Sequence, residues 1–223
     1  MKDFKVIEVK RSIFEDNNAD ADRLREQLKS EGTFLLNLMS SPGAGKTTTL
    51  KRTINMLKDE INIGVMEADI DSDVDAQAIT DTGVRAIQIH TGGMCHMDAA
   101  MTQQGLNEMG IDDVDLIFIE NVGNLVCPAE FDTGAGINIT ILSVPEGDDK
   151  PAKYPLVYTV SDVVLINKVD ALAVFDFDKE LVEKRIHTLN PKAQIFYISA
   201  KKDEGFESWI NYLKEKMKEW EEK

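Results

Sequence analysis

A glycine-rich turn at residues 38–53, LMSSPGAGKTTTLKRT, constrains the fold more than any other stretch of the chain. An apolar run ends where the turn begins, and a helix-length segment starts at Lys46. Such a turn binds phosphate, because its backbone N–H groups and the positive end of the helix dipole favour an anion. Ser40 replaces the first glycine of G-x-x-x-x-G-K-[ST], but the residues that wrap the phosphate come later. The sequence therefore predicts a strand, a phosphate-binding loop and a helix.

The residues of this loop have separate expected roles. Gly43 and Gly45 let the backbone amides come close to a phosphate oxygen. Lys46 neutralises the β- and γ-phosphates, and Thr47 is a ligand for Mg²⁺. The predicted phosphate-binding residues are Gly43, Ala44, Gly45, Lys46, Thr47 and Thr48.

Apolar runs alternate with helix-length segments along most of the chain. Strands are predicted at 34–39, 62–68, 84–89, 115–120, 137–144, 162–167 and 193–199. Helices are predicted at 46–59, 73–81, 97–109, 178–188 and 205–220. Runs that are apolar at every position suit strands buried on both faces, and the alternation with helices implies a parallel sheet. The sequence thus predicts an α/β fold, a doubly wound and mostly parallel β-sheet that binds ligands beyond the carboxyl ends of its strands.

Two segments stand apart from this alternation. Residues 1–32 contain a charged, weakly amphipathic helix that ends at Gly32, which predicts an N-terminal extension followed by one nucleotide-binding domain over 33–223. The segment 145–157, PEGDDKPAKYPLV, is expected to be an irregular loop at the ligand edge of the sheet. It serves either as a functional loop or as a plain connector.

Composition narrows the range of partners. The net charge of −15 argues against a nucleic-acid binder, because phosphate backbones attract lysine and arginine. No apolar run is long enough for a signal peptide or a membrane span, so we expect a cytoplasmic protein. In that compartment, Cys95 and Cys127 favour a metal or redox role over a structural disulfide.

A second motif, NKVD at 167–170, selects the base of the nucleotide. Asp170 can accept hydrogen bonds from the N1–H and 2-amino groups of guanine, Asn167 can reach the other base edge, and the Lys168 stem can cover the ring. Adenine would leave the carboxylate facing an acceptor, and an unsatisfied buried group costs about 1–3 kcal/mol. The Ala200 amide is a candidate donor to guanine O6. The predicted base-binding residues are Asn167, Lys168, Asp170, Ser199, Ala200 and Lys201.

Acidic residues follow two of the predicted strands. Glu120 lies at a strand end three residues before Gly123, where many GTPases carry D-x-x-G and sense the γ-phosphate with the glycine amide. Asp69 and Glu120 are the predicted Mg²⁺ ligands beside the loop threonine. Asp75 either orients the attacking water or belongs to an acidic helix start. The predicted catalytic residues are Lys46, Asp75 and Glu120.

A thiol-rich cluster is expected beside the nucleotide. Cys95 and His96 are adjacent at a strand end, and Cys127 lies four residues beyond Gly123. Thiolate and imidazole ligands suit Zn²⁺ and Ni²⁺, and three ligands leave the site open or completed by a second chain. The alternative is two buried cysteines with an incidental histidine. Because the cluster flanks the expected nucleotide-sensing loops, we expect nucleotide state and metal affinity to be coupled.

Together, five motifs resemble the hydrogenase nickel-incorporation GTPases of the HypB type, within the P-loop GTPase family that serves hydrogenase and urease maturation. They are NLMSSPGAGKTT, TGGMCHMDAAM, IENVGNLVCP, SVPEGDDKPAKYP and NKVD, and the similarity covers nearly all of residues 30–220. The related urease GTPases, of the UreG type, carry Cys-Pro-His where this chain has adjacent Cys95 and His96.

The resemblance implies a Mg²⁺-dependent GTPase that helps load nickel into the large-subunit precursor of [NiFe] hydrogenase, working with the nickel metallochaperone HypA. It also implies homodimerisation on GTP binding, with Cys95, His96 and Cys127 holding Ni²⁺ or Zn²⁺ at the dimer interface. Lys153 is the implied contact to the partner subunit's nucleotide. The chain lacks the N-terminal Cys-x-x-Cys motif and the histidine-rich stretch of some family members, so nickel handling rests on the interface site.

Two other functions stay open at the level of sequence. A regulatory GTP-binding module could hold a structural zinc ion at the same cluster. A nucleotide kinase or an ATP-driven transporter subunit is disfavoured by the NKVD motif.

Overall fold

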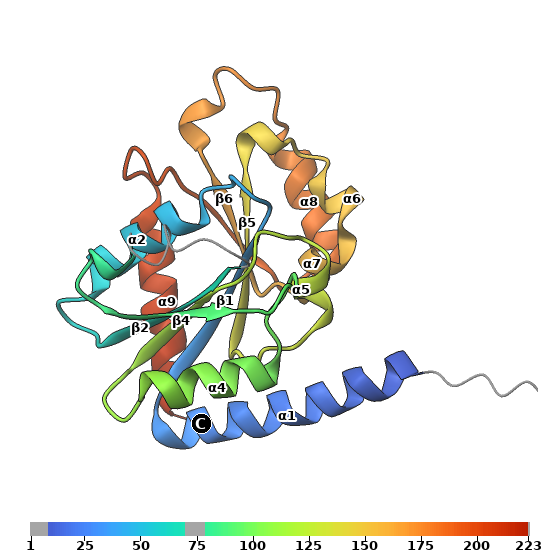
Figure 1. Cartoon of the computed structure of the whole chain (residues 1–223). Coiled ribbons are helices and arrows are strands. Elements are labelled where there is room, and N and C mark those ends of the chain that lie inside the picture. Colours follow the sequence, from blue (N-terminus) through green and yellow to red (C-terminus); the bar gives the residue numbers. More distant parts are fainter. Residues whose placement is uncertain (1–8, 70–78, 223) are drawn as a thin grey trace, which may run out of the picture.

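The computed structural model describes the backbone of residues 9–69 and 79–222 and the side chains of residues 14–68 and 79–222. In these ranges, seven parallel strands form one sheet in the order β3-β2-β4-β1-β5-β6-β7, flanked by helices (Figure 1). The strands are β1 Phe34–Ser40, β2 Ile63–Asp69, β3 Arg85–His90, β4 Leu116–Glu120, β5 Ile137–Ser143, β6 Val163–Asn167 and β7 Gln194–Tyr197. The predicted doubly wound parallel sheet is confirmed.

Helices follow most strands of the sheet. The α-helices are α1 Val9–Glu31, α2 Lys46–Leu57, α4 Ala99–Met109, α5 Cys127–Glu130, α6 Lys150–Lys153, α7 Pro155–Val160, α8 Lys179–Leu189 and α9 Phe206–Glu221. Two 3₁₀ turns, η1 Val144–Glu146 and η2 Val169–Ala171, follow β5 and β6. The predicted helix at 73–81 falls mostly outside the described residues.

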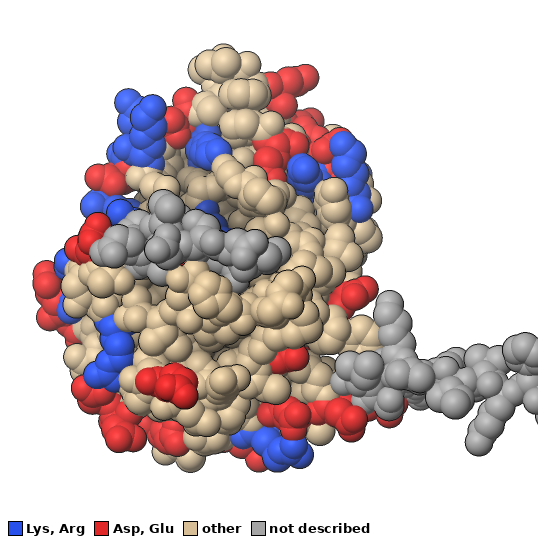
Figure 2. All heavy atoms as spheres, viewed as in Figure 1, with Lys and Arg blue, Asp and Glu red and all other residues tan. Residues whose placement is uncertain are grey.

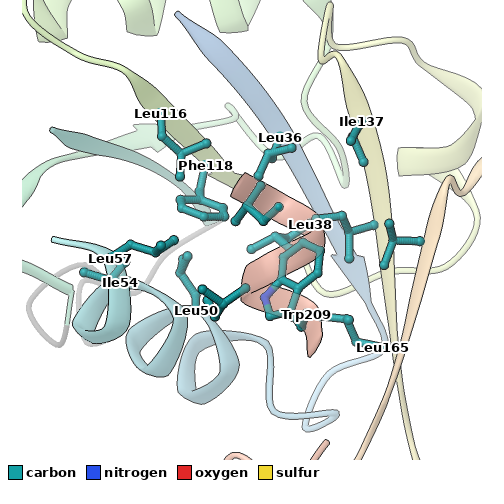
Figure 3. Close-up of a cluster of buried hydrophobic side chains, with 14 of the residues drawn as sticks. Leu36, Leu38, Leu50, Ile54, Leu57, Leu116, Phe118, Ile137, Leu165 and Trp209 are labelled. Atoms are coloured by element: carbon teal, nitrogen blue, oxygen red, sulfur yellow. The ribbon is translucent and has the colours of Figure 1, made fainter. Parts of the chain in front are cut away.

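The core lies on both faces of the sheet, as the continuous apolar runs predict. Every residue of β1 is buried, whereas the edge strands β3 and β7 are only partly covered. On one face, Trp209 of α9 packs with Leu50 of α2 and with Leu38 and Phe118 of the sheet (Figure 3). On the other face, α1 and α4 cover one half of the sheet, and α7 and α8 cover the other. Helices on both faces leave the carboxyl ends of the strands open for ligands.

The N-terminal helix α1 packs against the domain. Leu24 and Leu28 of α1 are buried in the same cluster as the apolar residues of α4. Arg25 donates to both carboxylate oxygens of Asp132 at 2.8 Å and to the carbonyl of Ala135 at 3.0 Å. The boundary at residue 32 stays a prediction.

The segment 145–157 is not the irregular loop that the sequence analysis expected. It contains the end of η1, the whole of α6 and the start of α7. A proline stands in the first turn of each, where its missing N–H would have no partner in the helix. The many prolines therefore start short helical turns instead of breaking up the segment.

Among the described residues, no helix combines the length and the apolar character needed to cross a lipid bilayer.

Candidate nucleotide and metal sites

The phosphate loop lies between β1 and α2, at the carboxyl edge of the sheet. Gly43 has a φ of 77° and Gly45 a φ of 95°, a region that strongly favours glycine. A Cβ atom on Gly45 would also lie only 2.5 Å from Nδ2 of Asn167. Two features therefore require glycine at position 45, its backbone angle and the close approach of Asn167.

A cavity of about 640 Å³ lies over this loop. Its lining residues are Ser40, Ser41, Pro42, Gly43, Gly45, Lys46, Thr47, Thr48, Glu67, Ala68, Val122, Gly123 and Lys168. The lining combines loop glycines, a lysine and the N-terminus of α2, which is the chemistry of a phosphate site.

Glu120, the last residue of β4, is fully buried beside the loop. Its Oε1 atom accepts hydrogen bonds from Lys46 Nζ at 3.0 Å and from the Thr47 hydroxyl. Its Oε2 atom is buried without a hydrogen-bond partner. An unpaired carboxylate oxygen next to a loop threonine is a fit for Mg²⁺, which prefers oxygen ligands.

The other acidic residues near this cavity differ in how much of them the structure describes. Asp69 ends β2, on the strand that neighbours β4, and its side chain is not described. Asp75 lies outside the described residues. Sequence reasoning missed Glu67, which is buried, lines the phosphate cavity and pairs in register with Glu120. Its signal was a charged residue inside an otherwise apolar strand, a position where carboxylates are rare unless they are paired.

A second cavity of about 450 Å³ continues from the first and shares three residues with it. Its lining residues are Gly45, Thr48, Asn167, Lys168, Asp170, Ala171, Ala200 and Lys201. The structure thus brings the NKVD and SAK motifs together beside the phosphate loop. Ser199 is buried next to this group and donates to Asp170 at 2.6 Å.

Side chains of the NKVD motif brace the loops as well as lining the cavity. Asn167 donates from Nδ2 to the Ala44 carbonyl at 3.0 Å and accepts from the Ala200 amide at 3.2 Å. Lys168 has a φ of 61° and donates to the Gly43 carbonyl at 2.6 Å. The hydrogen bond from Ser199 lowers the pKa of Asp170, so its carboxylate is charged at pH 7 and can accept hydrogen bonds from a base.

Cys95, His96 and Cys127 form one cluster, with their ligand atoms within 4.8 Å of one another. Side chains this close together could supply ligands to one Zn²⁺ or Ni²⁺ ion. The two Sγ atoms are 2.7 Å apart and both cysteines are free thiols. The hydrogen bond with Cys127, together with burial and the Cys127 charge, raises the pKa of Cys95.

His96 lies in surroundings that favour its neutral imidazole form. Its ring is buried and stacks on Phe131 at 3.8 Å between centroids. Burial lowers the pKa of His96, whereas the negative charges of Asp98 and Glu130 act to raise it and have the smaller effect. The Nδ1 atom is buried without a hydrogen-bond partner. An orphaned imidazole nitrogen beside two thiols suits Ni²⁺ or Zn²⁺.

Helix α1 contacts the residues that surround Cys95, His96 and Cys127. Asn17 accepts a hydrogen bond from the Ala99 amide at 3.0 Å and donates to the Asp132 carbonyl at 3.0 Å. Phe14 packs on Phe131, which also stacks on the His96 ring. The N-terminal helix therefore fixes both the start of α4 and the aromatic ring behind the histidine.

Lys153 lies at the end of α6 and lines neither the phosphate cavity nor the base cavity. Its Nζ atom pairs with Asp149 at 2.5 Å, and this hydrogen bond lowers the pKa of Asp149. Both side chains are exposed.

A family model described as "CobW/HypB/UreG, nucleotide-binding domain" matches residues 34–197. The hydrogenase maturation factor HypB of Escherichia coli K12 is 42% identical over 213 residues, which are 96% of this chain and 73% of that protein. The hydrogenase/urease maturation factor HypB of Helicobacter pylori J99 is 40% identical over 222 residues, which are 98% of this chain and 90% of that protein.

Solved structures of HypB proteins have the same fold as this chain. HypB from Archaeoglobus fulgidus superposes with a TM-score of 0.84 at 38% identity, covering 91% of this chain and 98% of that one. HypB from Helicobacter pylori in complex with nickel gives a TM-score of 0.84 at 41% identity, covering 92% and 96%. The resemblance expected from the motifs is confirmed. The chain belongs to the CobW/HypB/UreG family of nucleotide-binding domains, as a relative of the HypB hydrogenase maturation factors.

Proposed function

We propose that this protein is a Mg²⁺-dependent GTPase that carries nickel for insertion into [NiFe] hydrogenase, with its metal affinity set by the bound nucleotide. One observation carries the proposal. Residues 120–127, called here the 120–127 tract, border the phosphate cavity at Gly123 and end at a thiol of the metal cluster. A change at the terminal phosphate therefore has a short covalent path to the cargo.

Guanine is the proposed base because the cavity beside the phosphate loop carries a charged acceptor. Asp170 can pair with the N1–H and 2-amino donors of guanine, whereas adenine offers an acceptor at N1. The lowered pKa of Asp170 supports this pairing, since only the ionised carboxylate accepts from both donors.

The proposed reaction is attack of water on the γ-phosphate of GTP, which releases GDP and phosphate. Lys46 and the loop amides stabilise the negative charge that develops on the phosphate oxygens. Mg²⁺, held by Thr47 and Glu120 with Asp69 nearby, would supply further positive charge at the β- and γ-phosphates. Asp75 is the proposed residue that orients the water. We expect slow turnover by a single subunit, because pairing of two copies completes the site.

Pairing on GTP binding is proposed from the exposed surface around the cysteines. Met94 is 40% exposed and Val126 is 47% exposed, and each is next to a cysteine ligand. Such apolar side chains beside a metal cluster favour contact with another protein surface. A second copy would supply further metal ligands, and its Lys153 would reach across to the nucleotide.

The relatives' names support the proposed partners. HypB proteins are hydrogenase maturation factors, so the proposed client is the hydrogenase large-subunit precursor and the proposed co-worker is the nickel metallochaperone HypA. Nickel is favoured over zinc as cargo because a similar HypB has been solved with nickel. Nucleic acid is not a proposed partner. The described residues on the face in Figure 2 show acidic and basic side chains scattered mostly toward its edge, without a continuous basic band, and the net charge is −15. The proposed location is the cytoplasm.

Complementation tests this function. The chain is expressed in a bacterium that makes [NiFe] hydrogenase but lacks its own HypB, and hydrogenase activity is measured at low nickel. We expect activity to return with the natural chain and to stay at background with Lys46→Ala or Cys127→Ser. Glu222→Gln, at the end of the chain, is the control and should rescue fully. Rescue by Cys127→Ser equal to that of the natural chain would contradict the proposal.

A further inference from the structure

Asn124 sits where the phosphate loop, the metal cluster and the 120–127 tract meet. Its backbone forms an antiparallel bridge with Ser40, the residue that replaces the first glycine of the phosphate loop. Its Nδ2 atom donates to the carbonyl oxygen of Cys95 at 3.3 Å. Its Oδ1 atom accepts from the amide of Val126 at 3.0 Å, which shapes the turn that leads into Cys127. One side chain therefore contacts the backbone on both sides of the metal cluster.

We propose that Asn124 is a positioning residue that transmits nucleotide state to Cys95 and His96 as well as to Cys127. Without it, the tract would still hold Met97 through Asn121, but its hydrogen bond to Cys95 would be lost. With it, a shift of the tract moves both cysteines. The inference rests on the proposed coupling of nucleotide and nickel, and it names the group that makes the coupling reach the whole cluster.

Asn121, near the start of the tract, links Met97 to the sheet. It is fully buried, and its Oδ1 atom accepts from the amides of Met97 at 3.2 Å and Val122 at 2.9 Å. Its Nδ2 atom donates to Asn37 Oδ1 at 3.0 Å, and Asn37 donates in turn to Asn138 Oδ1 at 3.0 Å. This ladder ties the residue after His96 to strands β1 and β5, so the far side of the metal segment stays anchored to the sheet.

The tract also contacts the phosphate loop and the first turn of α2. Glu120 accepts hydrogen bonds from Lys46 and Thr47, both in the first turn of α2. A Cβ atom on Gly123 would lie 3.2 Å from the Pro42 ring, so the tract packs directly on the loop. Asn124 pairs with Ser40 through its backbone and donates a hydrogen bond to Cys95 through its side chain. A shift of the phosphate loop would therefore displace Asn124 and, with it, Cys95.

Asn124→Ser is the variant that separates this role from local structure. A serine hydroxyl can still accept from the amide two residues on, but it is too short to reach the Cys95 carbonyl. Asn107→Ser is the matched control, since Asn107 is an exposed residue of α4 whose side chain bonds only Gln103 among the described residues. Asn124→Asp is a second variant, which keeps the acceptor for Val126 and loses the donor to Cys95.

Two measurements on the purified full chain test the proposal. The first is the dissociation constant for Ni²⁺ with GDP bound and with a non-hydrolysable GTP analogue bound. The second is the rate at which diamide, a mild thiol oxidant that is itself reduced to the hydrazine, closes a disulfide between Cys95 and Cys127 in nucleotide-free protein. Thermal unfolding and GDP binding establish that each variant is folded.

For the natural chain and Asn107→Ser, we expect Ni²⁺ affinity to differ between the two nucleotides. In both Asn124 variants the ratio of the two Ni²⁺ affinities should fall about fivefold toward one. Disulfide closure should slow about fivefold. Both changes have the size expected for one lost hydrogen bond. A natural affinity ratio and closure rate in folded Asn124→Ser would overturn the role of Asn124. If the natural chain showed no nucleotide effect on Ni²⁺, the proposed coupling would fail, and with it the transmitting role.

Discussion

At the scale of single residues, the site is defined by groups that bond within the protein before any ligand arrives. Asn167 illustrates this, because both ends of its amide already link the phosphate loop to the SAK segment. Asp170, in contrast, gives one oxygen to Ser199 and lines the open cavity. Base selection is therefore expected to depend mainly on the aspartate, and loop geometry on the asparagine.

Asp170→Asn should reverse the preference for the base. An amide in place of the carboxylate puts an N–H group against the 2-amino donor of guanine, and we expect GTP to bind at least about tenfold more weakly. Xanthosine triphosphate, which carries a carbonyl at that position, should bind better than GTP. Competition against a fluorescent GDP analogue measures both affinities. An unchanged preference for GTP would remove the assignment of this cavity to guanine.

Ser199→Ala should move the acid limit of nucleotide binding. The Ser199 hydrogen bond is the main cause of the low pKa of Asp170, so the natural carboxylate stays charged, and GTP stays bound, until the pH falls through that low value. In the variant the pKa of Asp170 rises toward its usual range of about 4, so binding is lost at a higher pH. Affinities measured from pH 7 downward test this, and coinciding acid limbs for the two proteins would contradict it.

At the scale of helices and strands, periodicity predicted the sheet closely. The predicted run at 34–39 corresponds to β1 at Phe34–Ser40, because a strand buried on both faces is apolar at nearly every position. The same reasoning failed at 145–157, where prolines start short helices. It also could not find the contact of Asn124 with Cys95, because residues 29 positions apart meet only after the sheet has formed. The phosphate and base motifs were readable from sequence, since each is contiguous along the chain.

The packing of α9 on the sheet provides a stability test at this scale. Trp209 is 1% exposed, and its indole N–H donates to the Thr53 hydroxyl of α2 at 3.1 Å. Trp209→Ala should lower the free energy of unfolding by about 3–5 kcal/mol, since it opens a large cavity and removes the hydrogen bond to Thr53. Val174→Ala, at a side chain that is 81% exposed, should change it by less than about 0.5 kcal/mol. Denaturant unfolding of nucleotide-free protein compares the two, and a similar loss in both would contradict this account of the core.

At the scale of the whole molecule, the two sites share one edge of the sheet. The phosphate cavity lies over the ends of β1, β2 and β4, and the metal cluster joins the segments that follow β3 and β4. In this arrangement Lys153 lies apart from the chain's own phosphate and base cavities and is paired with Asp149. The proposed contact of Lys153 with the partner subunit's nucleotide thus requires a second copy and the release of that ion pair.

The central claim is that the terminal phosphate of GTP controls both pairing and nickel affinity through the 120–127 tract. Nickel titration of the purified chain, with mass measured by light scattering at each step, tests it most directly. With GDP we predict a single subunit and one nickel affinity, and with a non-hydrolysable GTP analogue a pair of subunits and a different affinity. The same mass and the same nickel affinity with both nucleotides would contradict the account.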